Sequence, residues 1–109
     1  MELQELEPQF LKIKDERNFL FVDNITEADG MSYLCPVCFK NNGNSSKGVH
    51  SILSWQPHVP EHMTPGPGRW NFVGTGYNDL SFVNGSSSIA LTGGCNAHFF
   101  IKEGKIIFC

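Results

Sequence analysis

Two pairs of metal-ligating residues, far apart in the chain, carry the most specific chemical signal in this sequence. Residues 35–38 form a C-x-x-C pair, and residues 95–98 form a C-x-x-H pair that directly follows two glycines. A two-residue gap lets one tight turn aim both ligands at the same point, and zinc binds thiolate and imidazole groups tetrahedrally. The pattern predicts one closed, structural Zn²⁺ site formed by Cys35, Cys38, Cys95 and His98.

Two further residues are alternative metal ligands. His50 lies in a predicted strand, where a packed or solvated imidazole is the competing interpretation. Cys109 follows a predicted strand that should pair with the strand carrying His98, so its thiol could approach the metal. Two interpretations without a metal stay open. Free cysteines are often small buried hydrophobes, and a C-x-x-C pair can be a redox motif, although the turn-rich surroundings lack a βαβ context.

The elements that must position these ligands are short strands. Apolar residues alternate or run briefly between turns rich in Gly, Asn, Ser and Pro. The predicted strands cover residues 9–14, 19–22, 48–55, 70–73, 79–83, 87–91, 97–101 and 105–108. The first two should form a hairpin, and Asn84-Gly85 is the strongest hairpin signal in the chain. We therefore expect a mainly β fold, a small antiparallel sandwich or open barrel with one short helix, stapled by one zinc ion.

The short helix is expected over residues 25–29. Asn24 and Glu27 have the spacing of a capping box, and Gly30 supplies a left-handed C-terminal stop. Residues 1–8 are polar and end in a proline, which predicts a flexible start with at most one helical turn. A length of 109 residues fits a single zinc-stabilised domain over residues 1–109.

The segment 56–69 holds four of the six prolines, which predicts a long and fairly stiff surface loop. Trp55, Arg69 and Trp70 lie at the ends of this loop. Because Arg and Trp anchor many protein interfaces, these three are the predicted partner-binding residues. The competing interpretation is that Trp70 fills the core and Arg69 lies flat on the surface.

Charge and composition argue against several classes of partner. The net charge is −3 and the pI is about 5.7, without the clustered Lys and Arg that binding to nucleic acid requires. No apolar stretch approaches the length of a membrane span, and the acidic N-terminus does not resemble a signal peptide. We expect a cytoplasmic protein whose thiols are metal ligands or free, since reducing conditions disfavour disulfides.

Several segments of the chain resemble a known family. They are ADG at 28–30, CPVC at 35–38, PGPGRW at 65–70, GTG at 74–76 and GGCNAHFF at 93–100. Together they are similar to small phage and prophage proteins of unknown function, some of which are labelled "ammonia monooxygenase". The resemblance implies a phage origin and a metal site on Cys35, Cys38, Cys95 and His98, and it implies no established reaction. The thiolate-rich ligand set also differs from the nitrogen and carboxylate set of an oxygenase.

Three functions follow from these expectations, and the weakest is nucleic-acid binding through the zinc site and exposed aromatic residues. The leading one is a zinc-stabilised phage accessory protein that acts as a protein-binding module in the host cell, on a host or virion protein. The alternative is a zinc-dependent hydrolase with an open metal site completed by His50 or His98, and with Glu61 or Glu103 as general base. The H-x-x-E-H spacing at 58–62 adds little to the alternative, because the neighbouring prolines forbid the helix that this motif requires.

Overall fold

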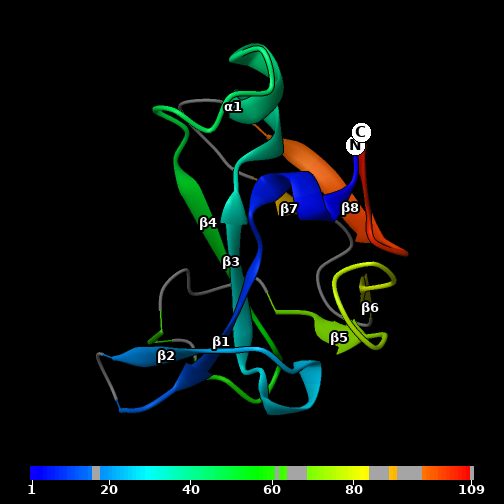
Figure 1. Ribbon diagram of the computed structural model, residues 1–109. Helices are drawn as coiled ribbons and strands as arrows, with labels where there is room; N and C mark the ends of the chain where they lie inside the picture. Colours follow the sequence, from blue (N-terminus) through cyan, green and yellow to red (C-terminus); the bar gives the residue numbers. More distant parts are fainter. Residues whose placement is uncertain (16–17, 61, 64–68, 84–88, 91–96, 109) are drawn as a thin grey trace.

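A four-stranded antiparallel sheet occupies the centre of the fold, in the strand order β2-β1-β3-β4 (Figure 1). The computed structural model describes residues 1–15, 18–60, 62–63, 69–83, 89–90 and 97–108. The four strands are β1 (Gln9–Ile13), β2 (Phe19–Val22), β3 (Gly30–Leu34) and β4 (Ser51–Trp55). β1 and β2 form the predicted hairpin, with Leu11 opposite Phe21.

Two smaller antiparallel sheets lie to one side of the central sheet (Figure 1). One consists of β5 (Asn71–Val73) and β6 (Ser81–Val83), and the other of β7 (Ile89–Ala90), β8 (His98–Lys102) and β9 (Lys105–Phe108). The turn between β8 and β9 has positive φ at both central residues, 49° at Glu103 and 74° at Gly104. Two positive φ angles are the signature of a type I′ turn, whose twist matches that of the strands it joins.

The main hydrophobic core joins the three sheets. Its buried side chains include Phe10 and Tyr33 of the central sheet, Leu80 before β6, and Phe99 of β8. The start of the chain also contributes to this core, because Leu3 and Leu6 of the 3₁₀ turn Leu3–Leu6 are fully buried. The Leu3 amide donates to the Gly104 carbonyl over 2.8 Å. Where the sequence predicts a flexible segment with one helical turn, the turn is present and the segment is packed.

A second apolar cluster lies at the other side of the central sheet, under the proline-rich segment. It consists of Leu11, Trp55, Val59 and Met63. Val59 and Met63 are buried although they belong to the segment predicted as a surface loop, and they cover the Trp55 indole. The described part of this segment is therefore a lid on a small core rather than a free loop.

The mainly β, antiparallel character predicted from the sequence is confirmed, and so is the presence of one short helix. The position of that helix is not the predicted one. Residues 25–27 form a single 3₁₀ turn in which the Asn24 side chain makes no capping hydrogen bond. The α-helix is instead α1 (Pro36–Asn41). Within the described residues, no helix combines the length and the apolar character that a membrane span needs.

The strongest predicted hairpin has a different outcome. Residues 84–88, which hold the predicted Asn84-Gly85 turn, lie outside the described residues. The strands on either side pair with other neighbours, β6 with β5 and β7 with β8. β3 was not among the predicted strands, yet it pairs with both β1 and β4.

Candidate metal centre

Two adjacent strands of the central sheet bring Cys35 and His50 together. β3 runs directly into Cys35, and His50 directly precedes β4. The antiparallel register places Leu34 opposite Ser51. One step further, the Cys35 amide donates to the His50 carbonyl over 2.9 Å. The two residues therefore lie opposite each other at the end of the β3–β4 ladder.

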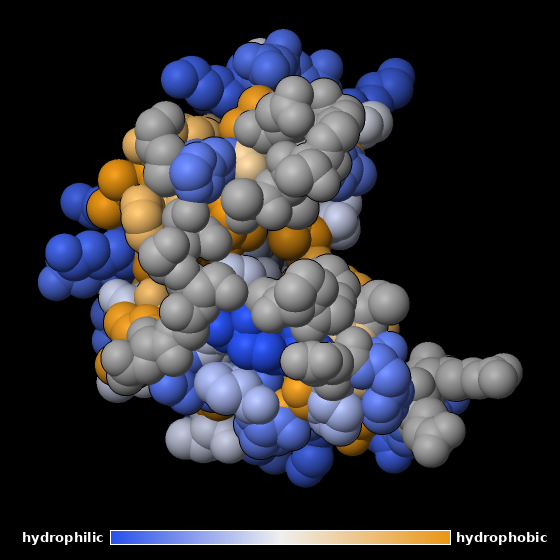
Figure 2. Space-filling view, turned by 180° about the vertical axis from the view of Figure 1, so that it is seen from behind, coloured by the Kyte–Doolittle hydropathy of each residue, from blue (hydrophilic) through white to orange (hydrophobic). Residues whose placement is uncertain are grey.

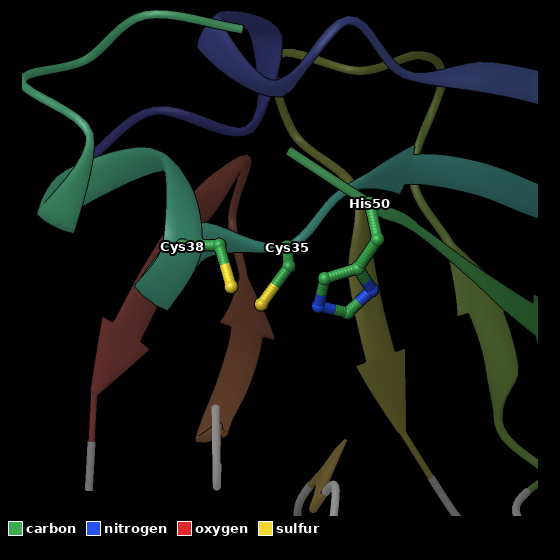
Figure 3. A group of neighbouring side chains, drawn as sticks. All are labelled: Cys35, Cys38 and His50. Carbon is green, nitrogen blue, oxygen red and sulfur yellow. The ribbon is translucent and has the colours of Figure 1, made fainter. Parts of the chain in front are cut away.

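The start of α1 supplies the second thiol. Cys35 occupies the N-cap position in an extended conformation, and Pro36 is the first helical residue, where a missing amide costs no intrahelical bond. The Phe39 amide donates to the Cys35 carbonyl over 2.9 Å, which closes the first turn. Residues three apart on a helical turn face the same side, so Cys38 lies next to Cys35. Figure 3 shows both sulfur atoms directed to one point, with the His50 ring beside Cys35.

The loop after α1 returns the chain to His50 and is held by one side chain. The Asn42 side-chain amide donates to the carbonyls of Ser45 and Lys47, over 3.0 and 2.7 Å. The Asn42 backbone amide donates to the Cys38 carbonyl over 3.0 Å. These bonds fix the path of the loop between the second thiol and the imidazole.

The distances suit a transition-metal ion. One ligand atom each from Cys35, Cys38 and His50 lies within 4.8 Å of the others. Ligands around one tetrahedral zinc ion lie roughly 3.3–3.8 Å apart, given bonds of about 2.0–2.3 Å. Closing the group on an ion therefore needs a contraction of at most about 1.5 Å, which small side-chain rotations provide. Neither cysteine forms a disulfide with a residue that the structure describes, and this metal group of Cys35, Cys38 and His50 can hold an ion.

Burial is graded across the group. Cys35 is fully buried, Cys38 is half-buried and His50 is exposed. The two thiols therefore lie on the inner side of the site, and the imidazole faces solvent from its outer side.

The predicted ligands have different outcomes. The structure brings together Cys35 and Cys38, with the alternative ligand His50 as their neighbour. His98 is the first residue of β8 and is exposed, and it is not one of the three grouped residues. Cys95 and the alternative Cys109 lie outside the described residues. The roles of Cys95, His98 and Cys109 as ligands stay predictions.

The predicted partner-binding residues are mostly interior. Trp55 is 1% exposed and Trp70 is 7% exposed. The Arg69 guanidinium donates to the carbonyls of Val59, Pro60 and Met63, over 3.1, 2.8 and 3.1 Å. Arg69 therefore holds the described part of the proline-rich segment over the second cluster. The burial favours the competing interpretation, in which Trp70 fills the core.

Of the two predicted bases of the alternative hydrolase, the structure describes only Glu103, and Glu103 is not part of the metal group. Glu103 lies in the β8–β9 turn, where its amide donates to Ser81 Oγ over 2.8 Å. Glu61 lies outside the described residues. Among the residues that the structure describes, the metal group contains two thiols and an imidazole and no carboxylate.

No known protein family, curated protein or solved structure matches this chain. The assignment of the site therefore rests on the geometry and chemistry of its own residues.

Proposed function

We propose that this chain is a zinc-stapled β domain, and that it acts as a protein-binding module rather than as an enzyme. The observation that carries the proposal is the convergence of the Cys35 and Cys38 thiols with the His50 imidazole within 4.8 Å. The resemblance to small phage and prophage proteins supports an accessory role on a host or virion protein.

Zinc suits this ligand set better than other common ions. Hard cations such as Mg²⁺ and Ca²⁺ prefer oxygen ligands, whereas two thiolates and an imidazole suit a borderline-soft ion. A fourth ligand would close the site, and the C-x-x-H pair of the sequence offers Cys95 or His98 for this position. A closed site of four protein ligands leaves no place for a catalytic water, so the ion would serve stability.

The position of the site supports a structural role. It lies at the point where β3, α1 and the start of β4 meet, and the loop 42–50 between them is largely exposed. Cys35 and Phe39 pack into the main core, but an exposed loop contributes few apolar contacts, so the segment 42–50 adds little packing to this end of the ladder. One bound ion would hold the three elements together. Surface residues elsewhere in the domain would then be available for binding a partner.

Elemental analysis of purified protein tests the metal part of the proposal. We expect one zinc per chain in the wild type, and marked loss of zinc in Cys35→Ser, Cys38→Ser and His50→Ala. The matched control is His58→Ala, because His58 is an exposed histidine outside the group. A protein that is folded and metal-free after purification with zinc supplied would refute the proposal.

X-ray absorption at the zinc edge identifies the fourth ligand. If Cys95 is the fourth ligand, the wild type should show three sulfurs and one nitrogen, and Cys95→Ser should show only two sulfurs. If His98 is the fourth ligand, the wild type should show two sulfurs and two nitrogens, and His98→Ala should lose one nitrogen. A coordinated water in place of both would contradict the structural role and favour the hydrolase. The binding part is tested by quantitative capture of host proteins, which should fail in Cys38→Ser if zinc supports the binding surface.

A further inference from the structure

An apolar groove on another part of the molecule is separate from the metal group. It lies between β6 and the β8–β9 hairpin, has a volume of about 390 Å³, and shares no residue with the metal group. Its lining includes Phe82, Val83, Phe100 and Ile107. Pockets for small molecules typically measure about 300–1,000 Å³ and are lined mainly by apolar side chains. The groove therefore has the size and lining of a small-molecule site.

The register of the hairpin forms one wall of the groove. Phe100 lies opposite Ile107 in the β8–β9 ladder. Their neighbours Phe99, Ile101 and Ile106 are buried, because side chains alternate between the two faces of a strand. Phe100 and Ile107 are consequently turned outward, 41% and 45% exposed. Two large apolar side chains lie side by side in water, and a ligand that covered them would gain free energy from burying their surface.

Aromatic stacking holds the opposite wall in place. The Phe82 ring stacks on the Phe72 ring, with centroids 4.5 Å apart and planes 3° apart. It also stacks on the buried Trp70, with centroids 5.7 Å apart. A ring fixed by two neighbours loses little conformational entropy when a ligand packs against it. The groove is thus preorganised on the β6 side.

The charged side chain among the described lining residues of the groove is a cation. Lys102 lines it, and Lys105 lies directly opposite Lys102 in the ladder. Neither ammonium makes an ion pair with any residue that the structure describes. Ser81 already accepts the amide of Glu103, the acidic residue between the two lysines in the chain. Figure 2 shows hydrophobic surface bordered by strongly hydrophilic side chains along its left edge, where β8 and β9 lie.

We infer that this groove binds a single-chain amphipathic carboxylate, such as a free medium-chain fatty acid. The apolar chain packs between Phe82 and the Phe100–Ile107 pair, and the carboxylate pairs with the Lys102 ammonium. The charge complementarity selects an anionic head group in a protein whose net charge is −3. A recess between two strands fits one chain, whereas a bilayer surface would need a broad exposed face.

Calorimetric titration with three probes of equal chain length tests the head group. We expect dodecanoate to bind, dodecan-1-ol to bind more weakly, and dodecylammonium to bind least. Equal binding of dodecanoate and dodecylammonium would overturn the inference. So would binding to anionic phosphatidylglycerol vesicles without measurable binding of free dodecanoate, because that result assigns the surface to a membrane.

Variants then locate the bound probe. Lys102→Ala should weaken dodecanoate binding about three- to fivefold, as expected for one partly exposed ion pair, and leave dodecan-1-ol binding unchanged. Phe100→Ala should weaken both probes about tenfold through lost apolar contact. Ile107→Ser changes the residue opposite Phe100 and should weaken both probes in the same way. It replaces Phe100→Ala in the test if that variant folds poorly. The controls Lys12→Ala and Leu20→Ala change an exposed lysine and an exposed leucine outside the groove. Loss of binding in the controls, or unchanged binding in Phe100→Ala and Ile107→Ser, would contradict the assignment.

Discussion

Replacing Gly30 by alanine is expected to destabilise the protein by about 2 kcal/mol through a clash with Trp55. An alanine Cβ at this position would lie 2.2 Å from Trp55 Cε3 and 2.7 Å from the Ser54 carbonyl oxygen. Carbon atoms in contact normally lie about 3.5–4.0 Å apart, so the indole or the strand must move by more than 1 Å. The φ angle of Gly30 is not in the left-handed region, so steric overlap alone is at issue.

The magnitude follows from what surrounds the indole. Trp55 is 1% exposed and packs with Leu11, Val59 and Met63, so it has no empty space to move into. The Ser54 oxygen belongs to the ladder backbone and cannot yield without disturbing β4. Overpacking of this kind costs about 1–3 kcal/mol. Because the buried indole has no space to move into, the cost lies at the upper end, about 3 kcal/mol. Alanine recovers about 0.4–1 kcal/mol by restricting the unfolded chain, which leaves the net loss near 2 kcal/mol.

Urea unfolding and thermal unfolding measure this loss. A loss of about 2 kcal/mol should lower Tm by roughly 8 °C in a domain of this size. Gly76→Ala is the matched control, because nothing lies within 4 Å of its added Cβ, and its stability should stay within about 0.5 kcal/mol of the wild type. In a Trp55→Leu background, Gly30→Ala should cost less, because the contact with the indole is removed and only the 2.7 Å contact with the Ser54 carbonyl oxygen remains. The same cost in both backgrounds, or a cost below about 0.5 kcal/mol in the wild type, would refute the steric explanation.

Tyr33→Phe should lower the free energy of unfolding by about 1–3 kcal/mol in chemical denaturation, because it leaves the buried Ser54 hydroxyl without its 2.9 Å partner. The double variant Tyr33→Phe with Ser54→Ala should cost less than the single variant, because no buried hydroxyl is left without a partner. Burial raises the pKa of Tyr33 above its ordinary value of 10.0, against a smaller lowering by Ser54, so the folded state keeps a proton that the unfolded state loses. Stability should therefore fall as pH rises above 10 in the wild type, and a Tyr33→Phe variant with the same slope would contradict this assignment. The amide of Gly76, then the amide and hydroxyl of Thr75, lower the pKa of Asp79 below 3.8. Its contribution to stability is present above pH 3.8 and lost as pH falls through the folded value, so Asp79→Asn should flatten the acid limb of a stability–pH curve.

The alternation of the strands was readable from the sequence, whereas their partners were not. The β1–β2 hairpin followed from two short apolar runs with a turn between them. β3 was missed because Met31 to Leu34 has no clear alternation, and a strand buried on both faces gives no period-two pattern. The position of α1 was signalled by Pro36 at a first helical turn, but Cys35 is not a usual capping residue.

Long-range register accounts for the remaining differences at the site. His50 becomes a neighbour of Cys35 only because Leu34 pairs with Ser51, and nothing local to either segment specifies that pairing. The same holds for Trp55 and Trp70. Their burial depends on which face of the fold each strand presents to the clusters, and composition alone made them look like interface anchors.

The β3–β4 ladder is supported differently at its two ends, which leads to a prediction about metal removal. At one end Gly30 lies opposite Trp55 against the second cluster, and at the other the Cys35 amide bonds the His50 carbonyl beside the metal group. Chelation should therefore open the metal end first. Amide hydrogen exchange should accelerate at least tenfold at Cys35, corresponding to about 1.4 kcal/mol of lost local stability. Exchange at Met31 should change little, because the Trp55 end keeps its packing. Uniform acceleration along β3 would instead mean that the ion supports the whole fold as one cooperative unit.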